Sequence, residues 1–195
     1  MTRKRRVGLL GGSFNPAHSG HLHISLLALK QLRLDEVWWL VAMQNPQKPT
    51  NNMAPYEDRL SFARAVAQNP RIFPSDMERA LGTRYTFETL RALKQRFPAM
   101  AFVWLMGADN LTQICRWRKW QRIFTLVPVA IFSRPTYVYP ALASIAARRF
   151  ASFRIGARRQ ANMATRSCPA WTFVHCRSHW GSSTAIRNAA ANVKN

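Results

Sequence analysis

A strand, turn, helix, strand pattern at the start of the chain is the feature that most constrains its fold. Residues 7–10 form a short apolar run, and the pair Gly11-Gly12 opens a turn. An apolar helix is predicted over residues 21–32, and a second strand over residues 36–42. Two strands joined through a helix predict a βαβ unit, with parallel strands and a right-handed crossover.

The same alternation continues along the chain. Further strands are predicted at residues 101–107, 127–132 and 171–175, with a short edge strand at 71–73. Helices are predicted at residues 56–67, 85–97 and 183–193 and near Leu111, and a long loop at 44–55. We expect one α/β domain over residues 1–195, Rossmann-like and doubly wound, with a mostly parallel sheet and helices on both faces. Ligands then bind beyond the carboxyl ends of the strands, where the strand order switches.

The charge of the chain is strongly unbalanced. It has 29 Lys and Arg against 8 Asp and Glu, a formal net charge of +21, and no acid follows Asp109. This balance favours polyanionic partners, which include nucleic acid, anionic lipid and phosphorylated small molecules, and charge alone does not choose among them. Residues 1–6 read as a basic N-terminal tail. The Arg- and Ala-rich residues 141–166 are compatible with helical, exposed or partly mobile chain.

Cysteine usage and hydropathy indicate the compartment. The three cysteines contain no Cys-x-x-Cys pair, so a reducing compartment is expected, with the cytoplasm as the default. No apolar run approaches the roughly 18 residues of a membrane-spanning helix, so no membrane partner is expected. The cysteines and histidines also lack zinc-ligand spacing, and no metal site is predicted on the chain.

The first strand-to-helix loop carries the most specific motif. It reads GGSFNPAHSGH over residues 11–21, without the spacing of a dinucleotide-binding fingerprint or a P-loop. His18 and His21 flank Gly20 where the helix begins, and a helix N-terminus favours anions. A lone histidine here would more often be a cap or a core residue. Two histidines three residues apart, beside a glycine-rich turn, favour a phosphate site.

This loop resembles the HxGH signature of the nucleotidyltransferase superfamily. Residues 181–187, GSSTAIR, resemble the superfamily's second motif, ISSTxIR, with Gly181 in place of the usual Ile. Alone, this Ser/Thr run could be an ordinary helix cap. Together, the two motifs imply one phosphate site built from two helix starts. Asn15 stands where many members have Asp.

The whole chain is most similar to the bacterial nicotinate-nucleotide adenylyltransferases. Segments that match their patterns in order are residues 38–41, 44–49, 84–90, 106–111, 117–120 and 132–135. Among them are a YTxxTL-like segment, a GxDxL-like segment and a helix with the spacing WxxW. The order and spacing of these segments cover nearly the full length of the chain.

The resemblance implies a role for each matching residue. The residues implied in catalysis are His18, His21 and Arg187. Those implied around ATP and its phosphates are Gly11, Gly12, Ser13, Phe14, Lys48, Gly107, Asp109, Arg134, Ser182, Ser183 and Thr184. Those implied around the nicotinate nucleotide are Asn45, Tyr85, Thr86 and Trp117, with the nicotinate ring stacking on the indole of Trp117. Purely structural roles remain open for some of them: Trp117 could be a core residue, Asp109 a helix cap, and Lys48 and Arg134 solvated surface charges.

The implied reaction is adenylyl transfer from ATP to nicotinate mononucleotide, which gives deamido-NAD and pyrophosphate. The acceptor phosphate is already an anion, so it can attack the α-phosphorus in line without a general base or a covalent intermediate. Mg²⁺ is expected, held by phosphates and water, because the chain offers few carboxylates.

Two other readings differ in partner. One is transfer to another phosphorylated acceptor, such as nicotinamide mononucleotide or phosphopantetheine. The other is a basic nucleic-acid-binding module, motivated by the charge and by residues 148–159. The motifs do not require nucleic acid, and specific nucleic-acid binding is not expected. A fragment of a class I aminoacyl-tRNA synthetase would need a Lys-rich signature loop, which is missing. A homo-oligomer is left open.

Overall fold

The computed structural model describes residues 3–44 and 53–176, and its strands form one seven-stranded sheet in the order β3-β2-β1-β4-β5-β7-β6. Every described strand pair is parallel. The strands are β1 (Arg5–Gly12), β2 (Glu36–Val41), β3 (Ile72–Ser75), β4 (Met100–Gly107), β5 (Val129–Phe132), β6 (Arg154–Ile155) and β7 (Trp171–Val174). The helices are α1 (Ser19–Gln31), α2 (Tyr56–Val66), α3 (Met77–Ala80), α4 (Thr86–Arg96), α5 (Ala108–Gln113), α6 (Trp120–Leu126), α7 (Val138–Leu142) and α8 (Ile145–Arg149), with 3₁₀ segments η1 (Ile114–Arg116), η2 (Ala151–Phe153) and η3 (Ala157–Thr165).

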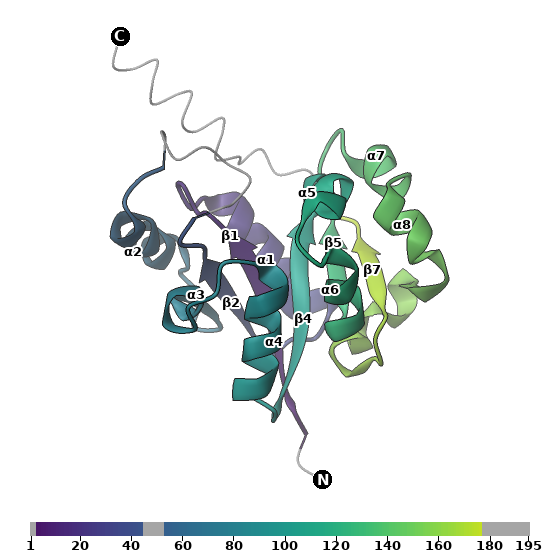
Figure 1. Cartoon of the computed structure of the whole chain (residues 1–195), viewed down its shortest axis with the longest axis horizontal. Coiled ribbons are helices and arrows are strands. Elements are labelled where there is room, and N and C mark those ends of the chain that lie inside the picture. The colour runs from purple at the N-terminus through teal and green to yellow at the C-terminus, as the bar shows by residue number, and fades with distance from the viewer. Residues whose placement is uncertain (1–2, 45–52, 177–195) are drawn as a thin grey trace.

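Helices cover both faces of this sheet, as predicted. In Figure 1, α4 and α6 lie in front of the strands and α1 lies behind them. Side chains of one face, such as Leu9 and Met106, pack with Leu90 of α4 and Ile123 of α6 in one core. Side chains of the other face pack with α1 and α2 in a second core. Because both faces are buried, the central strands are almost continuously apolar, which explains why their sequences lack alternation.

The strand order switches between β1 and β4. From β1 the chain proceeds through α1 to β2 and β3 on one side, and β4 then returns to the other side of β1. Residues Leu9 of β1 and Trp104 of β4 are paired neighbours. A doubly wound sheet binds its ligand at such a switch point, beyond the carboxyl ends of the strands. The predicted fold class is confirmed, and the described sheet is wholly parallel rather than mostly so.

The N-terminal tail is shorter than predicted. The first strand begins at Arg5, because the backbone of Arg5 and Arg6 pairs with the start of β4. Arg6 N–H donates to Asp35 Oδ2 at 2.7 Å, and Arg3 also donates to Asp35. These hydrogen bonds lower the pKa of Asp35, outweighing the burial that raises it.

The Arg- and Ala-rich residues 141–166 contain short helices and the unpredicted edge strand β6. Here β6 pairs with β7 through only two residues, too few to leave a periodic signal in the sequence. The predicted WxxW helix is wrong in its start. Trp117 is extended, Lys119 is left-handed with φ 53°, and α6 begins only at Trp120. The predicted helix 183–193 lies outside the described residues.

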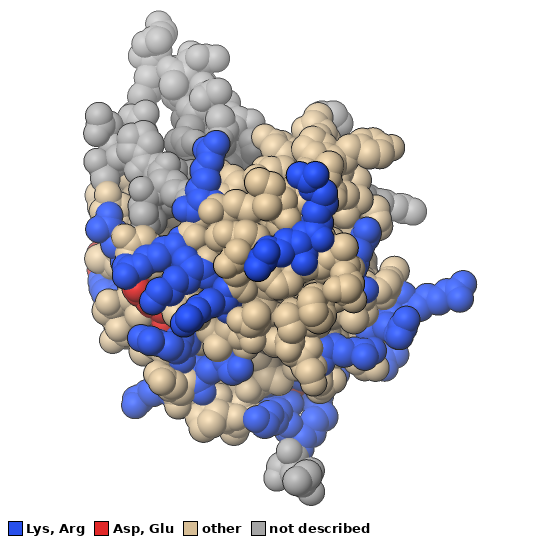
Figure 2. Space-filling view, turned by 45° about the vertical axis from the view of Figure 1, so that its right-hand side comes forward, with Lys and Arg blue, Asp and Glu red and all other residues tan. Residues whose placement is uncertain are grey.

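The face that carries α7 and α8 is strongly basic. Figure 2, which brings this side forward, shows many blue side chains and only small red patches. The cause is the acid-free sequence after Asp109. No helix in the described part of the chain combines the length and apolar character needed to cross a membrane.

Candidate active site

Two histidines close the start of α1 in a reciprocal arrangement. His18 is the N-cap, and its Nδ1 accepts from Gly20 N–H at 3.0 Å. In return His21 Nδ1 accepts from His18 N–H at 3.2 Å. A ring nitrogen that accepts carries no proton, so each neutral imidazole carries its proton on Nε2 and offers an Nε2–H donor. Such donors suit phosphate oxygens, and the first turn of α1 contains no acid to oppose an anion.

Two aromatic side chains, Phe14 and Trp39, pack against these imidazole rings. The ring centroids of His18 and His21 are 4.0 Å apart, and Phe14 lies 4.7 Å from His21. Phe14 is 1% exposed and stacks on Trp39 at 5.1 Å. Its backbone is left-handed, with φ 47°, which costs a residue with a side chain roughly 1–2 kcal/mol. The buried ring therefore holds the loop in a conformation that the backbone alone disfavours.

Trp39 is fixed from the side of α1. Its Nε1–H donates to Ser25 Oγ at 2.7 Å, and Ser25 donates to the carbonyl of His21 at 2.8 Å. Ser25 and Trp39 are both fully buried. These hydrogen bonds fix the orientation of Trp39, and so of the Phe14 ring that stacks on it, relative to the first turns of α1.

The exits of β4 and β5 contribute an ion pair. Gly107 ends β4 opposite Phe132 of β5, so Asp109 and Arg134 follow neighbouring strand ends. Arg134 Nη1 lies 3.3 Å from Asp109 Oδ2. A Cβ at position 107 would overlap Asp109 Oδ1, so any side chain there would have to displace the Asp109 carboxylate. Asp109 Oδ1 itself is buried and accepts no hydrogen bond from the described residues.

The residues implied around nicotinate gather beside this edge. Tyr85 is the N-cap of α4, Thr86 is its first residue, and no side chain caps this helix start. The guanidinium of Arg118 lies 4.8 Å from the centre of the Tyr85 ring. Its neighbour Trp117 meets Trp104 edge-on at 6.5 Å. Tyr85 and Trp117 thus both contact or belong to the segment 117–118, and Trp104 lies against both Trp117 and Gly11 of β1.

Some implied residues fall outside the described residues: Asn45, Lys48, Ser182, Ser183, Thr184 and Arg187. Their roles stay predictions. The end of β7 does reach the same edge of the sheet, because Ser133 N–H donates to Val174 O and Cys176 N–H donates to Ser133 Oγ. The chain thus leaves the described part beside the exit of β5.

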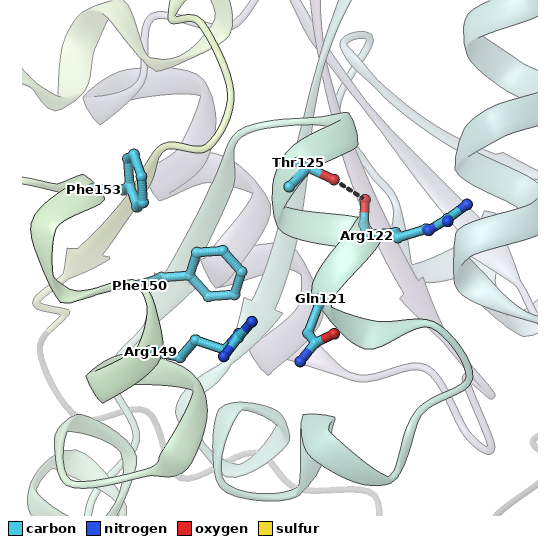
Figure 3. Close-up of a pocket in the computed structure, with 6 residues that line it drawn as sticks. All are labelled: Gln121, Arg122, Thr125, Arg149, Phe150 and Phe153. Atoms are coloured by element: carbon cyan, nitrogen blue, oxygen red, sulfur yellow. Dashed lines mark hydrogen bonds between the residues drawn. The ribbon is translucent and has the colours of Figure 1, made fainter.

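A separate hollow lies between α6 and the segment from α8 to η2. It has a volume of about 420 Å³ and is lined by Gln121, Arg122, Thr125, Arg149, Phe150 and Phe153. In Figure 3, Gln121 and Arg149 extend into the same space beside Phe150, whereas Arg122 extends away. None of the implied residues lines this hollow, and it does not lie at the strand exits. We therefore place the candidate site at the exits of β1, β4 and β5.

Sequence reasoning missed three residues that shape the site. From the sequence, Trp39 and Trp104 are predicted only as strand residues, and Arg59 belongs to no recognised motif. Arg59 is 1% exposed and shares the buried side of α2 with Ala63, four residues later. A charged residue at an apolar helix position was the available signal.

The described residues contain no group of three or more His, Cys, Asp or Glu that could hold a metal ion. Asp109, the acid at the exit of β4, is paired with Arg134. A magnesium ion there would have to take most of its ligands from phosphate and water.

Comparison with known proteins bears on the same residues. The family model described as cytidylyltransferase-like matches residues 9–189, which include the histidine loop and both strand exits. A relative from Cereibacter sphaeroides, named "Probable nicotinate-nucleotide adenylyltransferase", is 52% identical over 181 residues. The match covers 93% of this chain and 96% of the relative. The chain belongs to the nicotinate-nucleotide adenylyltransferase family.

Other members of the family agree in length and fold. A relative of the same name from Methylorubrum extorquens is 50% identical over 182 residues, covering 93% of this chain and 98% of the relative. The solved Plasmodium falciparum nicotinic acid mononucleotide adenylyltransferase in complex with NaAD has a TM-score of 0.70 at 15% identity, over 94% of this chain and 83% of that one. The same enzyme in complex with APC has a TM-score of 0.68. These structures share the fold of this adenylyltransferase family member.

Proposed function

We propose that the protein transfers the adenylyl group of ATP to nicotinate mononucleotide, giving deamido-NAD and pyrophosphate, as a step of NAD biosynthesis. The observation that carries this proposal is the reciprocal His18–His21 cap at the β1 exit, beside the switch point of the sheet. It occurs in a chain about half identical, over nearly its full length, to relatives named for this activity.

The reaction needs positioning and charge stabilisation rather than proton removal. The acceptor phosphate is ionised at neutral pH, so it attacks the α-phosphorus directly and pyrophosphate leaves on the opposite side. The Nε2–H groups of His18 and His21 donate to phosphate oxygens, and the start of α1 adds backbone donors. Arg187, Lys48 and the run Ser182 to Thr184 are proposed to complete the phosphate site.

Substrate recognition is divided between two neighbouring edges. Asp109 and Arg134 lie around the adenosine of ATP, at the exits of β4 and β5. Tyr85, Thr86 and Trp117 hold the nicotinate nucleotide with Asn45, where the indole stacks on the ring and the uncapped N–H groups of α4 receive the carboxylate. When bound, Mg²⁺ would be held mainly by the substrate phosphates and water, and it would supply positive charge to the phosphate oxygens.

The three cysteines are free, which supports a reducing compartment and a cytoplasmic site of action. The basic surface would also attract both substrates, since each is a polyanion. No nucleic-acid partner is required by this scheme.

An acceptor panel tests the proposal. Purified protein with ATP and Mg²⁺ should release pyrophosphate with nicotinate mononucleotide. Turnover only with nicotinamide mononucleotide or phosphopantetheine would assign a sister activity, and no turnover with any acceptor would refute adenylyl transfer. Tight, salt-steep binding to oligonucleotides without turnover would support the nucleic-acid reading instead.

A further inference from the structure

A buried arginine lies beneath the phosphate loop. Arg59, in the first half of α2, is 1% exposed and is one of the largest fully buried side chains of the protein. Over residues 3–44 and 53–176 no carboxylate pairs with it. A buried charge without an opposite charge is costly unless its donors are all satisfied. The hydrogen-bond partners of this guanidinium therefore indicate its structural role.

Four backbone carbonyls from three separate segments accept its hydrogen bonds. Nη1 donates to Ser13 O and to Ala42 O, both at 2.7 Å. Nη2 donates to Met43 O at 3.0 Å, and Nε donates to Ala54 O at 3.0 Å. Burial lowers the pKa of Arg59, but an arginine remains charged at neutral pH. The guanidinium thus joins the exit of β1, the exit of β2 and the segment before α2.

The contact with Ser13 acts on the phosphate loop itself. The next residue, Phe14, is the one held in the left-handed conformation. The N–H and C=O groups of a trans peptide point in opposite directions. Holding the carbonyl of Ser13 on Arg59 therefore directs the N–H of Phe14 away from α2. Arg59 therefore sets the direction of the Phe14 N–H, a backbone donor in the loop that carries the two histidines.

A second contact supports the same link. The N–H of Ala54 donates to Asn15 Oδ1 at 3.2 Å, while its carbonyl accepts from Arg59. The backbone of Ala54 is thus held by one residue of the loop and by the arginine below it. An aspartate at position 15 could accept the same hydrogen bond, which explains how asparagine can stand where many members of the superfamily have Asp.

We propose that Arg59 is a positioning residue of the nucleotide site. It fixes the loop of residues 13–15 against the exit of β2, and its charge, paired with no described carboxylate, adds positive potential beneath the phosphates. It touches neither substrate. This inference rests on the proposed adenylyl transfer, because it assigns Arg59 to the phosphate end of that site.

Three variants separate this role from simple packing. Arg59→Met removes the charge and all four hydrogen bonds at similar volume. Arg59→Lys keeps the charge, but its compact ammonium cannot match the planar fork. Arg64→Met is the matched control, since Arg64 is an exposed arginine on the same helix. Steady-state kinetics are measured against ATP at a temperature where circular dichroism shows each variant folded.

We expect Arg59→Met to lower kcat/KM for ATP by at least about tenfold, a smaller loss than the roughly 10²-fold for a donor that touches the substrate, because Arg59 acts through the loop. Arg59→Lys should lie between it and the wild type, and Arg64→Met should stay within about twofold of the wild type. In a further variant, Arg59→Ala, added guanidinium ion should restore part of the rate, and it should restore none of the rate of His21→Ala. A defect in stability alone would not give this selective rescue.

Folded Arg59→Met with wild-type kcat/KM would overturn the assignment, and so would a rate defect in Arg59→Ala that guanidinium does not relieve. If Arg59→Met does not fold, Arg59→Lys decides: wild-type kinetics in that variant would refute positioning by the planar fork. Failure of the wild-type protein to turn over any acceptor would instead refute the proposed function, so the two failures are distinguishable.

Discussion

The indole of Trp104 occupies the space where a side chain of Gly11 would lie. A Cβ at position 11 would overlap Cη2 of Trp104 and lie only 3.1 Å from Cζ2. Trp104 is 2% exposed and also meets Trp117 edge-on. The first glycine of the phosphate loop is therefore required by a residue of the neighbouring strand, and the same tryptophan links the loop to the nicotinate end.

Gly11→Ala should consequently destabilise the protein by about 1–3 kcal/mol, as overpacking of a rigid core does, and should reduce adenylyl transfer. Unfolding in urea and pyrophosphate release measure the two effects. Gly156→Ala is the matched control, because a Cβ there meets nothing within 4 Å. Equal stability of the two variants would show that the ring moves aside freely.

His18→Asn separates capping from catalysis. Asparagine is among the best N-cap residues, so the hydrogen bond from Gly20 N–H should be retained and stability should change by less than about 0.5 kcal/mol. The Nε2–H donor is lost, and kcat should fall by roughly 10²-fold or more. Thermal unfolding and steady-state kinetics report these separately. A wild-type kcat in His18→Asn would show that His18 acts only as a helix cap.

His21→Ala should lose most of the rate while the protein stays folded, by roughly 10²-fold or more in kcat, since the variant removes a preorganised donor. Near-native activity in a folded His21→Ala protein would exclude its catalytic role. Circular dichroism establishes folding, and pyrophosphate release gives the rate.

Asp109→Asn should weaken ATP binding more than it lowers kcat. The substitution breaks the ion pair with Arg134 without changing side-chain volume, so KM for ATP should rise about 3- to 30-fold with a smaller change in kcat. Asp76→Asn, which breaks the exposed pair with Arg79, is the control and should leave KM unchanged. An unchanged KM in both variants would remove Asp109 from the adenosine site.

Glu78 should make stability depend on pH. It is 8% exposed, and burial raises its pKa from 4.5 to about 7. The unfolded chain ionises near pH 4.5 while the folded protein keeps the proton, so the Glu78 contribution to stability falls as pH rises from about 4.5 to about 7. The full loss is up to about 3 kcal/mol, at roughly 1.4 kcal/mol per pKa unit.

Glu78→Gln removes this dependence. The variant should be more stable than the wild type at pH 8 and close to it at pH 4.5, measured by urea unfolding at both values. A stability difference of the same size at both pH values would show that the carboxyl group stays ionised in the folded protein.

Local sequence was enough to determine the alternation of strands and helices and the position of the histidine loop. Apolar runs of strand length, separated by helical periodicity, are typical of a parallel sheet buried on both faces, and the carboxyl ends of its strands bring Gly12, Gly107 and Phe132 to one edge. The two histidines also marked the start of α1 to within two residues: the helix begins at Ser19 rather than at the predicted residue 21, because His18 is its N-cap.

Only the tertiary structure decided what lies beneath that edge. The helical position of Arg59 hints at its burial, but its acceptors at Ser13, Ala42 and Ala54 are separated by many residues along the chain, so no local pattern could predict these partners. The same holds for Trp104 over Gly11 and for the break at Lys119 that delays α6. These features depend on contacts between neighbouring strands and loops, and the free energy of such contacts exists only once the sheet has brought them together.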